Sequence, residues 1–318
     1  MKKNGIESPI GIFDSGIGGL TVFRSVRKEV PNEDIVYFGD TARVPYGTKS
    51  KETITKFSIN NVQFLEGFRV KMVIVACNTA SSLSLEALQA KFSIPIIGVI
   101  EPGAREALRR TKNGRIGVIG TKSTIGSNAY ETGLKRLDPS VKVFSGACPL
   151  FVPFVEEGWL EGDVISRVAS TYLESLKSFK IDTLILGCTH YPLLARVIQK
   201  IMGNKVRLVN SAEETAKEAR RLMAKLKIAQ TRSPASPAGR RRSTELRFYV
   251  SDEPEQFRSL GERFLGTSIQ SVAKVDDQYR QPGFDRRLPA GEAGAKVNGR
   301  STTASGVVHG PFITEAGG

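Results

Sequence analysis

The fold is decided by two matching stretches, Val73-Ile74-Val75-Ala76-Cys77-Asn78-Thr79 and Leu184-Ile185-Leu186-Gly187-Cys188-Thr189-His190. Each begins with a short aliphatic run, which is typical of a parallel strand covered on both faces. Each run leads to a cysteine, to small polar residues and then to a helical pattern. Because open α/β sheets bind ligands at the carboxyl ends of their strands, both thiols are expected at a ligand-binding edge. Two such thiols in separate halves of the chain predict a pair that faces one substrate from opposite sides.

Short strands alternate with helices along most of the chain, which favours parallel sheets and the α/β class. The two cysteine-bearing units echo each other, so we expect two similar domains, each a mainly parallel sheet flanked by helices. Helices are predicted over Thr53–Phe68, over Pro254–Leu265, and from a capping box formed by Ser211 and Glu214. The predicted strands are Ile10–Phe13, Ile35–Phe38, Met72–Ala76, Ile94–Val99, Ile116–Ile119, Val141–Phe144, Thr183–Leu186, Val206–Val209 and Leu246–Val250.

Length and composition indicate an ordinary globular protein. The 318 residues are enough for two domains. No apolar run approaches the ~18–20 residues of a membrane span, and the first residues lack the apolar core of a signal peptide. Three cysteines are too few for a disulfide framework in a chain of this length. We therefore expect no membrane partner, and reduced thiols in the cytoplasm.

The net charge of +14 raises the question of a nucleic-acid partner. The excess is spread out: residues 1–230 hold 33 Lys and Arg against 22 Asp and Glu, and the remainder holds 13 against 10. The one dense cluster, Arg240–Arg242, follows a Ser-, Pro- and Ala-rich stretch, and segment 231–243 is predicted to be a solvated basic insertion. Without an aromatic RNA-binding motif, we expect no nucleic-acid partner. Residues 273–318 lose all periodicity and are predicted to form a disordered tail.

Two loops at the same predicted sheet edge carry polar side chains. In the first, Asp14 and Ser15 precede a glycine-rich turn that is neither a Walker A loop nor a dinucleotide fingerprint, because Thr21 replaces the third glycine. Their carboxylate and hydroxyl suit an ammonium and a carboxylate group, although either residue alternatively caps the next helix. The second loop follows the second strand and offers three groups to a ligand: the carboxylate of Asp40, the phenol of Tyr46 and the backbone N–H of Gly47. The structural alternatives are an Asx-turn for Asp40 and a packed aromatic ring for Tyr46.

The thiols of Cys77 and Cys188 are predicted to act as bases or nucleophiles, because a helix N-terminus lowers a thiol pKa from ~8.5 towards ~3.5–7.5. A metal site is not expected, since neither cysteine has a C-x-x-C partner and His190 is the only structured histidine. Imidazole or carboxylate groups beside a thiol tune its basicity, which makes His190 and the pair Glu156 and Glu157 candidates for that role. The plainer alternatives are a locally bonded histidine and a solvated helix end. Cys148 lacks such a context and is interpreted as structural.

Four ordered segments resemble the glutamate racemases of the aspartate/glutamate racemase superfamily, and the match runs from about residue 8 to 227 and resumes near 246–268. The segments are Ile12–Gly19, Tyr37–Gly47, Ala76–Ala80 and Gly187–Leu193. The resemblance implies a first domain of residues 1–98 plus 210–270, a second of residues 99–209, and an active site in the cleft between them. It implies glutamate as the small-molecule partner and D-glutamate supply for peptidoglycan synthesis, and it leaves a homodimer open.

The resemblance further implies a two-base reaction at Cα without any cofactor or metal. Cys77 matches the base that deprotonates D-glutamate and Cys188 the base that deprotonates L-glutamate. Asp40 matches a residue that assists the first thiol, and His190 with Glu156 match residues that assist the second. Because Glu157 is adjacent to Glu156, either carboxylate could be the matching one. The positions that match substrate-binding residues are Asp14, Ser15, Tyr46, Gly47, Asn78, Thr79, Thr121, Thr189 and His190.

The physics of stereoinversion agrees with a pair of thiols. One group must remove the α-proton while another delivers a proton to the opposite face, each within about 3–3.5 Å of the reacting carbon. The two sulfurs are therefore expected roughly 7 Å apart in the closed state. One alternative is racemisation of aspartate or another small acid, because the sequence does not reveal the pocket for the substrate side chain. The other alternative is a binding protein without catalytic activity.

Overall fold

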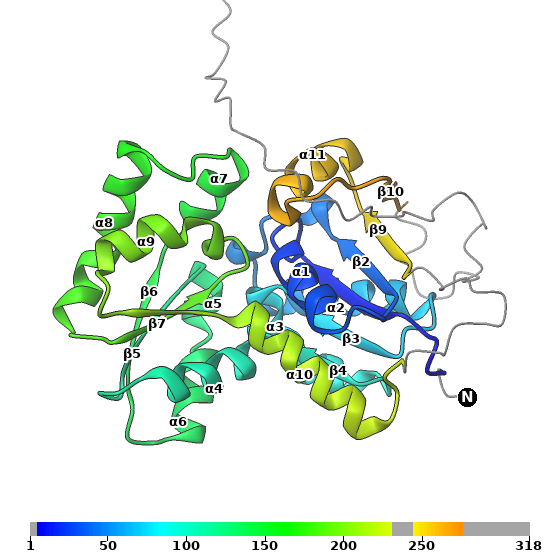
Figure 1. Cartoon of the computed structure of the whole chain (residues 1–318), viewed down its shortest axis with the longest axis horizontal. Coiled ribbons are helices and arrows are strands. Elements are labelled where there is room, and N and C mark those ends of the chain that lie inside the picture. Colours follow the sequence, from blue (N-terminus) through cyan, green and yellow to red (C-terminus); the bar gives the residue numbers. More distant parts are fainter. Residues whose placement is uncertain (1–4, 231–243, 276–318) are drawn as a thin grey trace, which may run out of the picture.

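Two parallel β-sheets, each covered by helices, form the molecule (Figure 1). The computed structural model describes residues 5–230 and 244–275. The predicted α/β class with two parallel sheets flanked by helices is confirmed. The basic insertion predicted at 231–243 and residues 276–318 of the predicted tail lie outside the described residues.

The first sheet has the strand order β10-β9-β2-β1-β3-β4, and all of its pairings are parallel. Alternate residues of its strands point to opposite faces. Ile12 and Ile74 join a core with helices α1 and α10, while Phe13 and Val75 join a second core with α2 and α3. The strands are β1 (Ile10–Asp14), β2 (Ile35–Gly39), β3 (Met72–Val75), β4 (Ile96–Gly98), β9 (Leu246–Val250) and β10 (Ala273–Lys274).

The second sheet has the order β6-β5-β7-β8 and is also parallel throughout. Its central strand β7 is buried along its whole length, as expected for a strand covered on both faces. The strands are β5 (Arg115–Gly120), β6 (Lys142–Ala147), β7 (Thr183–Gly187) and β8 (Arg207–Asn210). Every strand predicted from the sequence is present in one of the two sheets, with ends that differ by at most three residues.

Eleven α-helices and three 3-10 turns connect the strands within the described residues. The helices are α1 (Leu20–Glu29), α2 (Lys51–Glu66), α3 (Asn78–Lys91), α4 (Ile100–Arg110), α5 (Lys122–Gly126), α6 (Ala129–Leu137), α7 (Phe151–Glu156), α8 (Asp163–Ser178), α9 (Ala195–Met202), α10 (Ser211–Leu226) and α11 (Pro254–Leu265). The 3-10 turns are η1 (Thr41–Arg43), η2 (Tyr46–Thr48) and η3 (Tyr191–Leu194).

Two local predictions were wrong. The capping box of Ser211 and Glu214 does not form, because the side chain of Asn210 caps α10 by accepting from the backbone N–H of Ala212 at 3.0 Å, and Glu214 pairs with Lys217 instead. An asparagine one residue earlier satisfies the same unpaired N–H groups of the first turn. The tail was predicted to start at residue 273, but Ala273 and Lys274 form β10 by pairing with β9. A strand this short leaves no periodic pattern.

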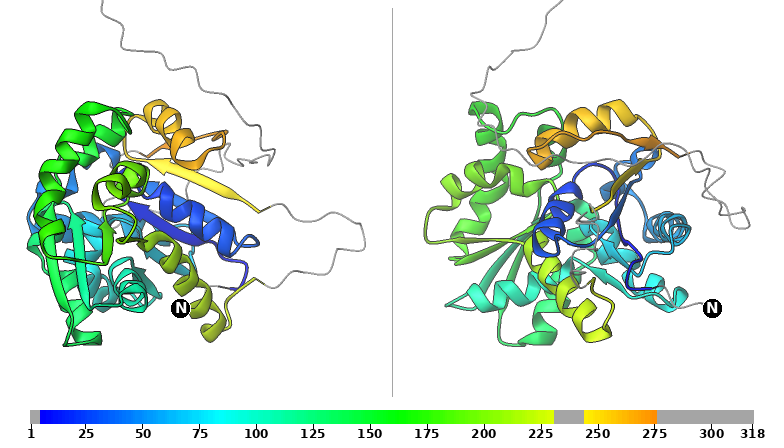
Figure 2. Two further views of the ribbon diagram at one scale, coloured as in Figure 1. Left: turned by 60° about the vertical axis from the view of Figure 1, so that its left-hand side comes forward. Right: turned by 45° about the vertical axis from the view of Figure 1, so that its right-hand side comes forward.

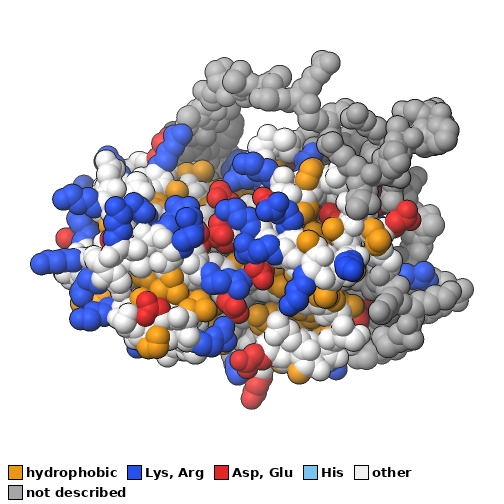
Figure 3. Space-filling view, turned by 60° about the horizontal axis from the view of Figure 1, so that its bottom comes forward, with side chains coloured by type: hydrophobic (Ala, Val, Ile, Leu, Met, Phe, Trp, Pro, Cys, Tyr) orange, Lys and Arg blue, Asp and Glu red, His pale blue; other side chains and the backbone are white. Residues whose placement is uncertain are grey.

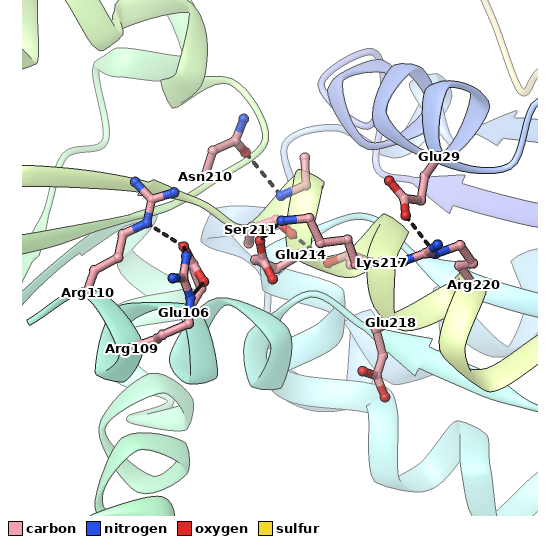
Figure 4. Close-up of polar contacts among 12 residues, drawn as sticks. Glu29, Glu106, Arg109, Arg110, Asn210, Ser211, Glu214, Lys217, Glu218 and Arg220 are labelled. Carbon is pink, nitrogen blue, oxygen red and sulfur yellow. Dashed lines mark hydrogen bonds and ion pairs between the residues drawn. The ribbon is translucent and has the colours of Figure 1, made fainter. Parts of the chain in front are cut away.

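Helix α10 leads from the second sheet back towards the first and packs against both halves (Figures 1 and 2). Figure 4 shows its polar contacts: Arg220 reaches Glu29 of α1 at 2.8 Å, while Asn210 caps the helix start. On the other side, Glu218 accepts from Arg105 of α4 at 2.8 Å. The helix is thus fastened to elements of both sheets, and its first residue, Ser211, lies where they meet.

The basic surplus is distributed over the surface. The face in Figure 3 shows many Lys and Arg side chains with Asp and Glu between them. Several charged side chains of the protein are paired, such as Arg109 and Arg110 with Glu106. The predicted cluster Arg240–Arg242 is outside the described residues. Among the helices that the structure describes, none combines the length and apolarity that a membrane crossing requires.

Candidate active site

The carboxyl edges of the two sheets meet at the loops that follow β1 and β7. A Cβ atom on Gly18 would lie 2.3 Å from Thr189 Oγ1 and 2.5 Å from the His190 ring, so only a glycine fits this approach. The Thr21 hydroxyl lies 3.2 Å from the Thr189 carbonyl oxygen, to which it donates. Thr21, noted in the sequence only as a departure from a nucleotide motif, therefore joins the two edges.

Cys77 stands between β3 and α3, as the N-cap residue of that helix, and its side chain is 5% exposed. Its Sγ lies 3.6 Å from Ser15 Oγ. Burial and the negative charge of Asp14 raise the pKa of the Cys77 thiol to about 12, against the smaller opposing effects of the Ala80 N–H and Ser15. The prediction of a thiol pKa lowered by the helix was wrong for this state, because desolvation outweighs the helix N-terminus.

Asp14 ends β1 and is fully buried. Its Oδ2 accepts from the Gly16 N–H at 3.0 Å, while its Oδ1 has no hydrogen-bond partner among the described residues. It does not cap a helix, since α1 begins only at Leu20. Burial raises the pKa of Asp14, and the charge of His190 and backbone N–H groups oppose that rise. An unpaired buried carboxylate oxygen is a suitable partner for a cationic ligand group.

Asp40 is held by the phenol of Tyr46, which donates to Asp40 Oδ2 at 2.5 Å. Asn61 in turn donates to the Tyr46 hydroxyl at 3.1 Å. Asp40 precedes η1 without a side-chain cap hydrogen bond, so the Asx-turn alternative does not hold for that helix start. The sequence suggested that the Tyr46 hydroxyl could contact a ligand, but this hydroxyl is bound to Asp40. Burial and the negative charge of Asp40 raise the pKa of Tyr46.

Cys188 directly follows β7, is 6% exposed, and has His190 as its neighbour. The Cys188 Sγ lies 3.8 Å from His190 Nδ1, and His190 Nε2 lies 3.1 Å from Glu156 Oε1. Glu156, at the end of α7, is therefore the carboxylate on this histidine, and Glu157 is exposed. Burial disfavours the charged ring, but hydrogen bonds to Cys188 and Glu156 outweigh it and raise the pKa of His190 to about 10.

The start of α3 is joined to the second sheet by threonines. The Thr79 hydroxyl lies 3.0 Å from that of Thr121 and 3.2 Å from that of Thr124. Beside them, Gly47 approaches so closely that a Cβ would lie 2.8 Å from Thr121, and its carbonyl accepts from Ser123 at 2.7 Å. Sequence reasoning missed Thr124 and Ser123, although their position after the helix-capping Thr121 was a usable signal.

The predicted residues thus form one assembly with two sulfur-bearing sides. The charge of Cys188 contributes to raising the pKa of Cys77, and the charge of His190 acts on Asp14, so groups from the two sheets influence each other directly. All three cysteines are free. Among the described residues, no group of three or more His, Cys, Asp and Glu side chains suits a metal ion. Two nearly buried thiols, one beside the Ser15 hydroxyl and the other beside the His190 imidazole, are suited to proton transfer.

Comparison with known sequences defines the class of protein. The model of the Asp/Glu/hydantoin racemase family matches residues 10–219. This chain therefore belongs to the Asp/Glu/hydantoin racemase family.

Individual relatives are more specific. The glutamate racemase of Geobacter metallireducens is 52% identical over 267 residues, which cover 84% of this chain and 96% of the relative. The glutamate racemase of Syntrophus aciditrophicus is 46% identical over 276 residues, covering 86% of this chain and 99% of the relative.

Solved structures agree with the fold. The crystal structure of the glutamate racemase isoform RacE1 from Bacillus anthracis has a TM-score of 0.79 and 44% identity, covering 85% of this chain and 97% of that one. The glutamate racemase of Francisella tularensis, solved in complex with D-glutamate, has a TM-score of 0.78 and 40% identity, covering 85% and 98%. The two-sheet arrangement is thus that of known glutamate racemases.

Proposed function

We propose that this protein is a cofactor-independent glutamate racemase that interconverts L- and D-glutamate through Cys77 and Cys188. The single observation that carries the proposal is the arrangement of the two thiols. They follow parallel strands of different sheets, are nearly buried, and act on each other electrostatically. The names of the relatives support glutamate as the substrate. The product D-glutamate would serve peptidoglycan synthesis.

Substrate binding begins with the ammonium group. Asp14 Oδ1, buried and without a partner among the described residues, would accept this cation. An ammonium group at Asp14 neutralises the negative charge that helps to raise the pKa of Cys77. Substrate binding would therefore make it easier for the Cys77 thiol to lose its proton and become a thiolate. The other contacts would come from the helix and turn starts around the thiols, where N–H and hydroxyl groups suit carboxylates: Ser15, Gly47, Asn78, Thr79, Thr121 and Thr189.

On one face of Cα, Cys77 would take the α-proton from D-glutamate. Ser15 Oγ, at 3.6 Å, is the hydroxyl that lies beside its sulfur. Asp40 would assist this thiol, and the hydrogen bond from Tyr46 keeps that carboxylate in place. In the opposite direction, the protonated thiol returns the proton to the same face.

On the other face, Cys188 would take the α-proton from L-glutamate. In the opposite direction Cys188 would give its proton to Cα, and the positive charge of His190, which Glu156 holds in place, would stabilise the thiolate that forms. The pair of thiols moves protons, while fixed dipoles and the exclusion of water stabilise the carbanion-like state. Free thiols are required throughout, which supports a reducing compartment such as the cytoplasm.

The domain division remains part of this proposal, with residues 1–98 plus 210–270 on one side of the substrate and 99–209 on the other. Its support is that β1 to β4 and β9 pair in one sheet, and β5 to β8 in another. Both thiols are nearly buried, so a substrate between the two sheets would enter by a separation of the two sides.

Proton exchange in deuterated water tests the function. The enzyme is incubated with L-glutamate or with L-aspartate, and incorporation of deuterium at Cα is followed by nuclear magnetic resonance while circular dichroism follows optical activity. We expect exchange and loss of optical activity with glutamate. Exchange with aspartate alone would replace glutamate by aspartate as the substrate, and a protein that binds glutamate without exchange would be a binding protein.

A further inference from the structure

A buried tyrosine outside the predicted site contacts the residue next to Cys77. Tyr130, in the first turn of α6, is 3% exposed. Its hydroxyl accepts from Asn78 Nδ2 at 2.8 Å and also forms a hydrogen bond with the Ser211 side chain. The three residues come from α3, α6 and α10, so this one hydroxyl joins elements of both sheets at the point where α10 crosses between them.

The space around the Tyr130 ring is shaped by two glycines. A Cβ on Gly187, the residue before Cys188, would lie 3.0 Å from the ring, and a Cβ on Gly103 would lie 3.4 Å from it and 3.1 Å from the Ser211 Cβ. The ring therefore packs between the strand end that presents Cys188 and the helix start that follows Cys77. Burial raises the pKa of Tyr130, so the hydroxyl stays neutral and keeps its hydrogen for donation.

The amide of Asn78 is only half satisfied. The side chain is 2% exposed, Nδ2 is committed to Tyr130, and Oδ1 has no hydrogen-bond partner among the described residues. Leaving a buried acceptor without a partner is costly, so this oxygen is suited to a donor that arrives with a ligand. Because the amide nitrogen and oxygen differ only by a half-turn about one bond, their placement depends on the hydrogen bond that Nδ2 makes.

We propose that Tyr130 is a positioning residue for racemisation: its hydroxyl holds the Asn78 amide so that Oδ1 is kept for a donor group of the substrate beside Cys77. The inference rests on the proposed racemase function. Ser211 supports it from the far side by binding the same hydroxyl. Without the phenol, the amide rotates and presents a donor where an acceptor is required, which misplaces the substrate relative to the thiol.

The first test removes the hydroxyl and keeps the ring. Tyr130→Phe is expected to lower kcat/KM for glutamate about 10-fold, the scale of one misplaced hydrogen bond of ~1.4 kcal/mol. The matched control is Tyr249→Phe on β9, which removes the hydroxyl of a tyrosine packed against Phe64 and Phe68, and it should leave kcat/KM unchanged. Full activity of Tyr130→Phe in an active wild-type background would overturn the inference, whereas an inactive wild type would instead overturn the proposed function.

A double-mutant cycle separates positioning from general packing. If Tyr130 acts through Asn78, then adding Tyr130→Phe to Asn78→Ala causes no further loss, measured by deuterium exchange at Cα. Losses that multiply would show that the tyrosine acts independently and would overturn the inference. Should Tyr130→Phe fail to fold, Ser211→Ala leaves the ring and hydroxyl in place. It is expected to lower kcat/KM about 3-fold in the wild type and not at all with Asn78→Ala, and equal effects in both backgrounds would overturn the inference.

Discussion

The two cysteines stand at equivalent strand ends, but their surroundings differ in charge. Cys77 begins an α-helix directly, has a hydroxyl beside its sulfur, and feels the negative charge of Asp14. Cys188 is followed by a 3-10 turn before α9 begins at Ala195, and an imidazole linked to Glu156 lies beside its sulfur. At neutral pH the Cys77 sulfur therefore holds its proton, and on the other side the His190 ring is protonated.

This asymmetry shows that a symmetric reaction does not need symmetric bases. The two enantiomers of glutamate have the same free energy, so kcat/KM must be equal in both directions whatever each thiol contributes. What differs between the sides is how each proton is held before transfer. Variants that disturb one side can therefore change the individual steps unequally while lowering both directions together.

The largest effects are expected from removing either sulfur. Cys77→Ser and Cys188→Ser should each lower racemisation by about 10²- to 10⁴-fold, because a hydroxyl is a far weaker acid than a thiol and positioned proton transfer contributes on that scale. The measurement is the rate of optical inversion of L- and D-glutamate. Substantial turnover by either variant would end the two-thiol assignment.

Thiol alkylation provides the control for these two variants. Bound glutamate should protect the wild type from inactivation, because the substrate would cover both sulfurs. Cys148 is fully buried and its sulfur makes a long contact with the Gly146 carbonyl at 3.9 Å, so Cys148→Ala should be inactivated like the wild type. Inactivation that ignores glutamate would contradict the placement of the substrate.

The next effect concerns His190. His190→Gln keeps a polar side chain but removes the ionisable ring, and we expect kcat/KM to fall about 10- to 100-fold in both directions. Because the ring serves Cys188, the step that removes the proton from L-glutamate should become more rate-limiting than its counterpart. The primary isotope effect with α-deuterated L-glutamate should therefore exceed that with D-glutamate. Equal increases for both enantiomers would mean that His190 serves both thiols.

A smaller effect is expected from the carboxylate behind the histidine. Glu156→Gln keeps the shape but weakens the charge-assisted hydrogen bond to His190 Nε2, and should lower kcat/KM several-fold, roughly the effect of ~1 kcal/mol. Glu157→Gln is the matched control, since that neighbouring side chain is exposed. The comparison also decides the one-residue ambiguity left by the sequence: a loss confined to Glu157→Gln would assign the assisting role to the other carboxylate.

Much of the fold could be predicted from the sequence because buried parallel strands appear as short aliphatic runs. Aliphatic runs such as Met72–Val75 predicted their strands, and the ends of these runs placed Cys77 and Asp14 at one edge. Contacts between the two halves of the molecule could not be predicted from the sequence. These contacts join residues far apart in sequence, and no local pattern encodes such pairs. Examples are the hydrogen bonds between Thr21 and Thr189, between Thr79 and Thr124, and between Tyr130 and Asn78. The thiol pKa of Cys77 depends on burial in the folded state, which spacing alone does not reveal.

The smallest expected effect is on stability rather than activity, and it tests the charge on the Cys188 side. The pKa of His190 is raised from an ordinary value near 6.5 to about 10 by its hydrogen bonds to Cys188 and Glu156. Below pH ~6.5 the ring is protonated in both the folded and unfolded states, so its contribution to stability is fully present. As pH rises towards 10, the unfolded chain loses this proton first, and the contribution is progressively lost.

Urea unfolding of the wild type and of His190→Gln between pH 6 and 10 measures this contribution. Other groups also titrate in this range, including the thiols of the unfolded chain with their ordinary pKa of ~8.5, so the difference between the two proteins at each pH is the informative quantity. We expect the stability advantage of the wild type over His190→Gln to shrink as pH rises across that window. A constant difference would mean that folding does not raise the pKa of His190, and the two sides would then be more alike than their surroundings indicate.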